Sequence, residues 1–250
     1  MDNNIPERNL MVVADSNFEQ VTEYLHTYSV PVLRSISRIG TKSAVIGGVH
    51  DTRENFEALV RDKNPAMILI LGHGLEDMTT GYDNQPILDS KNAHLMKNRT
   101  IFIFSCLSGK ELAPLLIREN CNSVISFKEE FLFFIDSNAR TPLVDKLARG
   151  NLTAAFEVVK TLASGGTYED AHTAMSEAFD KEITYWKTQN VPGASFVISS
   201  LMWDQEHAVQ LGDESATVSD PVAAPLITPL AIVGTGIGLA AAIYAMRKAR

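Results

Sequence analysis

Two residues that together can carry out nucleophilic catalysis each follow a short apolar run. His73 comes two residues after the run 66–71, and Cys106 comes two residues after the run 100–104. A thiolate is the reactive form of cysteine, and a nearby imidazole can promote its formation and protonate a leaving amine. We therefore predict that Cys106 is a catalytic nucleophile and that His73 is its acid and base.

Glycine residues flank His73 and suit the same chemistry. Gly72 and Gly74 allow a tight turn of the backbone and leave room for a substrate carbonyl. The backbone N–H groups of Gly74 and Cys106 are candidate donors of an oxyanion hole, which stabilises the negative charge of a tetrahedral intermediate. A nucleophile, an acid/base group and two donors are thus predicted within one stretch of the chain.

The surrounding sequence predicts a sheet that would bring the two residues together. Short apolar runs that alternate with helical patterns are typical of parallel strands covered by helices on both faces. Such runs occupy residues 10–14, 43–49, 66–71, 100–104 and 123–127, and two further strands are expected at 195–202 and 208–211. We predict an α/β fold, a three-layer α/β/α sandwich with a mainly parallel sheet, in which functional groups collect beyond the carboxyl ends of the strands.

Capping patterns predict where the helices begin. Helix starts are expected at Ser16-x-x-Glu19, Asp51-x-x-Glu54, Asn151 and Thr167-x-x-Asp170. Pro31 is expected to interrupt the first of these helices. The polar segment 75–90 is expected to be an exposed loop, and residues 203–207 are expected to join the last two strands as a turn.

Composition and charge restrict the classes of function. The 250 residues are 45% apolar and 21% charged, which suffices for one large α/β domain, assigned to residues 1–212. The net charge is −8 and no basic cluster is present, so a nucleic-acid surface is not expected. The two cysteines form neither a disulfide framework nor a metal-binding spacing. Cys121 is expected to be a structural thiol, and neither a metal nor another cofactor is predicted.

The C-terminal residues differ from the rest of the chain. Residues 213–225 have the composition of a linker, residues 226–246 contain no charge, and residues 247–250 form a basic tail. About 20 apolar residues suffice to cross a bilayer as a helix, so 226–246 is predicted to be a single-pass membrane anchor, with a buried core helix as the alternative. Gly234 and Gly238 would allow two such helices to self-associate. The basic tail 247–250 favours a cytoplasmic C-terminus and hence an exported domain, but the N-terminus shows no secretory signal pattern, so the catalytic domain is expected on the cytoplasmic side.

The two motifs resemble those of the caspase-like cysteine peptidases, a clan that contains caspases, metacaspases, gingipains and CHAT-domain proteases. Gly72-His73-Gly74 and Ser105-Cys106-Leu107-Ser108-Gly109 are similar to the histidine and cysteine motifs of metacaspases, S-G-H-G and D-S-C-H-S-G. The resemblance extends over residues 10–212 in the order of elements, and it implies that His73 and Cys106 form a catalytic dyad. It also implies that residues 201–212 help to build the wall of a substrate pocket.

The sequence departs from the metacaspase pattern in two places. Phe104 stands where metacaspases have the aspartate that binds a basic side chain of the substrate, so basic specificity is not inherited from that position. His73 and Cys106 are 33 residues apart, fewer than the roughly 50 residues typical of caspases. No pair of acids matches the metacaspase calcium site. Phe104, Asp204 and Glu206 are the residues predicted to line the substrate pocket.

We predict a membrane-anchored thiol protease, an endopeptidase that hydrolyses protein or peptide substrates. Two alternatives remain open. One is a catalytically silent module that binds a partner at a membrane, and the other is an effector whose C-terminal helix perturbs the membrane when the domains cluster. An activating protein partner is compatible with each of these functions.

Overall fold

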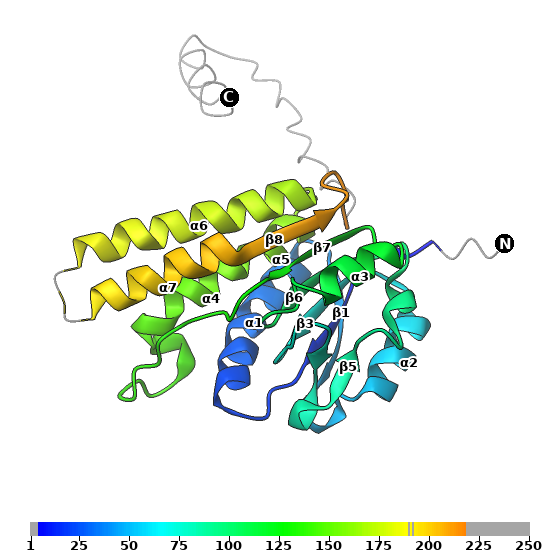
Figure 1. Ribbon diagram of the computed structural model, residues 1–250, viewed down its shortest axis with the longest axis horizontal. Helices are drawn as coiled ribbons and strands as arrows, with labels where there is room; N and C mark the ends of the chain where they lie inside the picture. The colour runs from blue at the N-terminus through cyan, green and yellow to red at the C-terminus, as the bar shows by residue number, and fades with distance from the viewer. Residues whose placement is uncertain (1–4, 190, 192, 219–250) are drawn as a thin grey trace, which may run out of the picture.

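The computed structural model describes residues 5–189, 191 and 193–218, and the centre of this part is a six-stranded sheet (Figure 1). The strands lie in the order β2-β1-β3-β6-β7-β8. Their bounds are β1 (Glu7–Asp15), β2 (Lys42–Gly47), β3 (Pro65–Leu71), β6 (Thr100–Phe104), β7 (Ser123–Phe127) and β8 (Ala208–Gly212). β8 runs antiparallel to β7, and the other neighbours are parallel. The predicted mainly parallel sheet is confirmed.

Helices cover both faces of the sheet, because its central strands are apolar on both sides. Alternate side chains of β1, such as Val12 and Val13, enter two separate cores. One core lies under α1 (Gln20–Arg38), α4 (Lys146–Ala155), α5 (Glu157–Ala163), α6 (Tyr168–Thr188) and α7 (Ala194–His207), and the other lies under α2 (Arg53–Lys63) and α3 (Leu112–Arg118). Figure 1 shows α6 and α7 on one side of the sheet and α2 on the other.

The strand predictions hold best in the middle of the sheet. The predicted strands 100–104 and 123–127 coincide with β6 and β7. The predicted strand 43–49 is too long at its end, because β2 stops at Gly47. Gly48 has a φ of 54°, which suits glycine, and begins the 3₁₀ helix η1 (Gly48–His50).

The cap of α1 is Glu19 and not Ser16, so the predicted capping box is displaced. The Glu19 carboxylate accepts the backbone N–H groups of Thr22 at 2.8 Å and of Val21 at 3.1 Å. Ser16 is still tied to the sheet, because its N–H donates to the carbonyl of Leu71 at 3.0 Å. The helix therefore begins later than the prediction, at Gln20.

The predicted caps of the next helices show the same kind of error, except for α6. Thr52 caps α2 in place of Asp51, which is buried. Asp145 caps α4, whereas Asn151 lies inside that helix with its side chain buried. Thr167 and Asp170 form the predicted capping box of α6.

α1 passes through Pro31 without a break, which contradicts the predicted interruption. Pro31 lies on the exposed side of the helix. Buried residues on both sides of it, among them Tyr28 and Val32, fix the two halves to the same core. This tertiary packing offsets the hydrogen bond that proline removes.

Residues 194–207 form the helix α7, so the predicted strand 195–202 and turn 203–207 are wrong. The buried residues Ala194, Val197 and Leu201 recur at helical spacing and join the core that α4 and α6 cover. The run that contains Val197 and Ile198 favoured a strand locally, but packing against neighbouring helices decided the structure. The strand predicted at 208–211 is confirmed as β8.

The predicted exposed loop 75–90 contains a small hairpin, formed by β4 (Thr79–Thr80) and β5 (Pro86–Leu88). Ile87 and Leu88 are fully buried in the core under α2, and both threonines are buried as well. A few apolar residues anchor this hairpin within an otherwise polar sequence, which is why composition predicted a loop.

The C-terminal predictions concern residues that are not described. The linker is described only as far as residue 218, and the predicted membrane anchor 226–246 and basic tail 247–250 lie outside the described residues. Gly234 and Gly238 lie outside them too. Within residues 5–189, 191 and 193–218, no helix combines the length and the apolar character needed to span a bilayer.

Candidate active site

The pairing of β3 with β6 places the two predicted catalytic residues at the same level. β3 and β6 are parallel neighbours, and Leu71 lies opposite Phe104. His73 and Cys106 each follow two residues later, so both stand just beyond the carboxyl edge of the sheet. The structure therefore brings together the strand ends that carry the predicted nucleophile and base.

The loops that follow the two residues are joined directly. The carbonyl of Glu76 accepts the N–H groups of Glu111 at 3.1 Å and Leu112 at 2.8 Å. A Cβ atom on Gly74 would lie 2.5 Å from the carbonyl oxygen of Cys106, which no side chain allows. Glycine at position 74 thus permits the backbone of the histidine loop to contact the backbone of the cysteine loop.

The backbone of His73 is fixed by the hairpin that follows it. Its carbonyl accepts three donors, the N–H of Thr80 at 2.9 Å and the hydroxyls of Thr79 at 3.1 Å and Thr80 at 3.2 Å. Gly72 packs against the same hairpin, because a Cβ atom there would lie 2.4 Å from the Thr80 carbonyl. These contacts hold the histidine in place.

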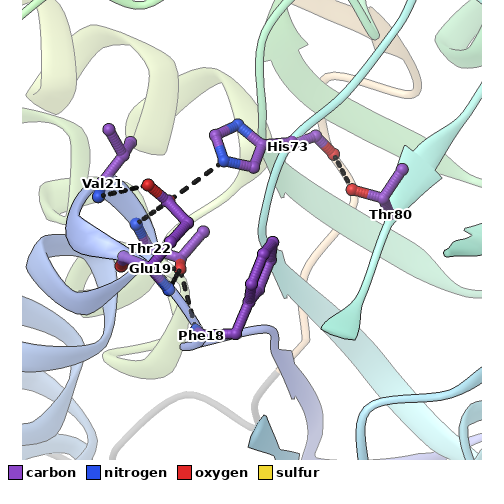
Figure 2. A network of polar contacts seen from close by, with 6 residues as sticks. All are labelled: Phe18, Glu19, Val21, Thr22, His73 and Thr80. Carbon is purple, nitrogen blue, oxygen red and sulfur yellow. Dashed lines mark hydrogen bonds and ion pairs between the residues drawn. The ribbon is translucent and has the colours of Figure 1, made fainter. Parts of the chain in front are cut away.

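The imidazole of His73 contacts the first residues of α1. Figure 2 shows its Nε2 beside the carboxylate of Glu19, where Nε2 and Oε1 are 3.1 Å apart. The ring of Phe18 packs edge-on at a centroid distance of 6.3 Å. Glu19 was predicted only as a helix residue, and its contact with the candidate base was missed. The one available signal was its position just after the first strand, at the same edge of the sheet as His73.

Glu19 is held in its ionised form by its surroundings. Partial burial alone would raise its pKa, but the N–H groups of Thr22 and Val21 and the ring of His73 outweigh burial and lower the pKa. An anion at the N-terminus of a helix is also stabilised by the helix dipole. A charged carboxylate therefore faces the imidazole.

Cys106 is partly buried, and its thiol is stabilised in the protonated form. Burial raises the pKa of Cys106. The backbone N–H groups of Phe131 and Cys106 counteract this, whereas the carboxyls of Glu130 and Asp204 reinforce it. The sulfur therefore needs a base at the moment of attack.

The residues after Cys106 form a tight turn that is held by buried serine hydroxyls. Leu107 has a φ of 62°, which is uncommon for a bulky residue and turns the chain sharply beyond the thiol. Buried hydroxyls support the turn. Ser105 donates to Ser108 at 3.1 Å, and the Ser108 and Ser126 hydroxyl oxygens lie 2.6 Å apart.

The three residues predicted to line a substrate pocket occupy different environments. Phe104 is 1% exposed and packs among aromatic rings, including that of Phe131 at 4.7 Å. Asp204 is also buried, on α7 rather than in a turn, and accepts the N–H of Leu132 at 2.8 Å. Glu206 is exposed on the same helix. Phe104 and Asp204 thus support the loop beside Cys106 from within the protein.

The second cysteine does not take part in this arrangement. Cys121 is buried, and burial raises its pKa to about 12, which agrees with a structural thiol. Among the described residues, no group of three or more His, Cys, Asp or Glu side chains is placed to hold a metal ion.

Comparison with solved structures identifies the fold. No protein-family model and no curated protein matches the sequence. The structure is similar to the Arg-specific cysteine proteinase gingipain R, with 15% identity over 86% of this chain and a TM-score of 0.51. A second structure, described only as a protease, gives 12% identity over 86% of this chain and a TM-score of 0.52.

The chain has a caspase-like fold. The alignments cover 49% of the gingipain R chain and 50% of the second protease chain, so this protein spans about half the length of each. At these identities, the likeness concerns the arrangement of helices and strands. The predicted resemblance to the caspase-like clan is confirmed at that level.

The raised pKa of Cys106 predicts the pH dependence of its alkylation. In the native protein we expect iodoacetamide to modify Cys106 slowly at pH 7 and faster as the pH rises past 9, because only the thiolate reacts. Cys121 should be protected by burial and serves as an internal control. Mass spectrometry of the two cysteine peptides gives both rates. A Cys106 rate that is already maximal below pH 7 would contradict the assignment of a protonated thiol.

Proposed function

We propose that this protein is a cysteine endopeptidase in which Cys106 is the nucleophile and His73 transfers the proton. The observation that carries the proposal is the position of both residues at the same level of two neighbouring parallel strands. The caspase-like fold supports it, because the similar structures are described as proteases. Protein or peptide chains are the proposed substrates.

The first half of the reaction forms a thioester. His73 takes the thiol proton as the sulfur of Cys106 attacks the carbonyl carbon of the substrate. The N–H groups of Gly74 and Cys106 are the proposed oxyanion donors for the resulting tetrahedral intermediate. The C–N bond then breaks, and His73 returns the proton to the leaving amine.

The second half releases the acid and restores the enzyme. A water molecule loses a proton to His73 and attacks the thioester carbonyl. The C–S bond breaks, and the sulfur of Cys106 regains a proton from the imidazolium. Each proton that His73 accepts is thus returned within the cycle, and no external acid, base or cofactor is required.

Glu19 is proposed as a positioning residue for His73. Its carboxylate is fixed by two backbone N–H groups of α1 and lies within hydrogen-bonding distance of Nε2. It therefore orients the ring and supplies a counter-charge when the imidazole becomes an imidazolium.

We also propose that residues 226–246 anchor the domain to a membrane. The support for this proposal is the uncharged 21-residue sequence from 226 to 246. An anchor of this kind would restrict cleavage to substrates that reach the membrane surface.

Labelling by a peptide that carries a thiol-reactive group tests the nucleophile and the base in the full-length protein. Cys106→Ala should abolish labelling, and His73→Ala should slow it by about 10²–10⁴-fold, because proton transfer to a positioned base is lost. Cys121→Ala is the matched control and should label like the wild type. Labelling that persists in Cys106→Ala would rule out the proposal, and equal rates for His73→Ala and wild type would instead favour a non-catalytic binding module.

Glu19→Gln tests the positioning role while one side-chain oxygen remains to accept a backbone N–H at the helix cap. We expect kcat to fall about tenfold with little change in KM, because one charge-assisted hydrogen bond to the imidazolium is lost. A fall in thermal stability with unchanged kcat and KM would show that Glu19 acts only as a cap.

Flotation with lipid vesicles tests the anchor. The full-length protein should rise with the vesicles, and Ile237→Asp should reduce this fraction strongly, because a charge at the centre of a membrane helix costs about 3 kcal/mol. Ile237→Leu is the matched control. Equal flotation of the two variants would show that residues 226–246 do not cross the bilayer.

A further inference from the structure

Four buried side-chain oxygens at the ends of β1 and β2 have no hydrogen-bond donor among the described residues. They are Oδ1 of Asp15, Oγ of Ser16, and both carboxylate oxygens of Asp51. Asp15 is 3% exposed, and Ser16 and Asp51 are fully buried. The other oxygen of Asp15 lies 2.6 Å from Nδ1 of His26. Buried polar atoms of native proteins nearly always have partners, so such a concentration calls for an explanation.

The backbone around Ser16 and Asp51 is held by main-chain hydrogen bonds and not by their side chains. The N–H of Ser16 donates to Leu71 at 3.0 Å, and the N–H of Asp51 donates to Gly48 at 2.9 Å. The carbonyl of Asp51 accepts the N–H of Tyr82 at 2.9 Å. Neither Ser16 nor Asp51 caps a helix, although both were predicted to do so. Their polar side-chain atoms are therefore free for another purpose.

Packing places Ser16 beside Gly72, which contacts Thr80 of the hairpin after His73, and places Asp51 beside Gly81 of the same hairpin. A Cβ atom on Gly72 would lie 3.3 Å from Oγ of Ser16 and 2.4 Å from the carbonyl of Thr80. Gly81 follows Thr80 in the chain, and a Cβ atom on Gly81 would lie 3.0 Å from the carboxyl carbon of Asp51. Glycine at these two positions keeps side chains away from the Ser16 hydroxyl and the Asp51 carboxyl.

The charge in this corner is not balanced. In the described part of the chain, neither Asp15 nor Asp51 forms a salt bridge with lysine or arginine, and His26 is the one basic group paired with Asp15. Burial and the nearby Asp15 raise the pKa of Asp51 to about 8. A charged and unpaired carboxylate at Asp51, close to Asp15, would carry a large energetic cost in such a buried place.

We propose that Asp15, Ser16 and Asp51 bind a hard divalent cation, Ca²⁺ or Mg²⁺, at the carboxyl ends of β1 and β2. Carboxylate and hydroxyl oxygens are the ligand types that these ions prefer, and such ions complete their coordination with backbone carbonyls and water. A proton on Asp51 is the simpler way to remove one charge, but it satisfies few of the four acceptors. A cation satisfies all of them and balances both carboxylates.

A cation at this position would stabilise both supports of His73. Ser16 lies three residues before Glu19, which contacts the imidazole, and Thr80 of the adjoining hairpin holds the His73 carbonyl. The site goes beyond the proposed peptidase function and does not depend on it.

Metal binding to the full-length protein, purified in mild detergent, tests the proposal without any measurement of activity. Elemental analysis gives the bound Ca²⁺ and Mg²⁺, and thermal unfolding after EDTA treatment is followed while each ion is added back. We expect about one ion per chain and a rise in Tm of about 5–10 °C when the preferred ion reaches 100 times its Kd. Asp51→Asn should lose this rise.

Asp83→Asn is the matched control, because Asp83 is an exposed acid in the same hairpin and should leave the rise intact. If Asp51→Asn does not fold, Ser16→Ala replaces it, because that change removes a neutral ligand and should weaken the same response. Wild-type protein that holds no ion and gains no stability from either ion would overturn the proposal. Asp51 would then be a buried carboxyl held by its proton, and the unfolding free energy would fall as the pH rises from about 4 to 8 in wild type but not in Asp51→Asn.

Discussion

The candidate active site depends on the register between β3 and β6. Because successive side chains of a strand point to opposite faces, a slip of one residue would turn either His73 or Cys106 away from the other. The register is fixed by strands that are buried throughout, in which Leu71 and Phe104 belong to one core and Ile70 and Ile103 to the other. The chemistry beyond the strand ends thus rests on apolar packing inside the sheet.

The loops beyond β3 and β6 contain unusual backbone conformations that are held by surrounding hydrogen bonds. Leu107 has a left-handed φ, and Gly74 touches the backbone of the cysteine loop at a distance that excludes a side chain. Such features are tolerated only where the surroundings determine them fully. Here hydrogen bonds from the buried serine hydroxyls, to the Glu76 carbonyl and within the hairpin after His73 fix the backbone.

The sequence predicted that His73 and Cys106 lie at the same edge of the sheet because each follows an uninterrupted apolar run, and such runs favour parallel strands with functional ends. It failed where side chains compete for one role. Ser16 and Asp51 fit the pattern of a cap, yet Glu19 and Thr52 cap the helices, and only the folded sheet decides which residue is free to do so. α7 was wrongly predicted as a strand because its β-branched residues favour a strand locally. The helices against which they pack come from other parts of the sequence. The contact of Glu19 with His73 spans 54 positions of the chain, and no local pattern reports it.

The charges around His73 and Cys106 fit the proposed mechanism, in which the proton moves only during attack. Burial and the carboxyls of Glu130 and Asp204 oppose a resting thiolate at Cys106, whereas the lowered pKa of Glu19 provides a permanent negative charge beside the imidazole. The environment therefore disfavours charge on the sulfur before substrate arrives and favours charge on the imidazole once it has taken the proton. Since Glu19 is also the cap of α1, the same carboxylate stabilises the start of the helix that packs on the sheet and contacts the imidazole of His73.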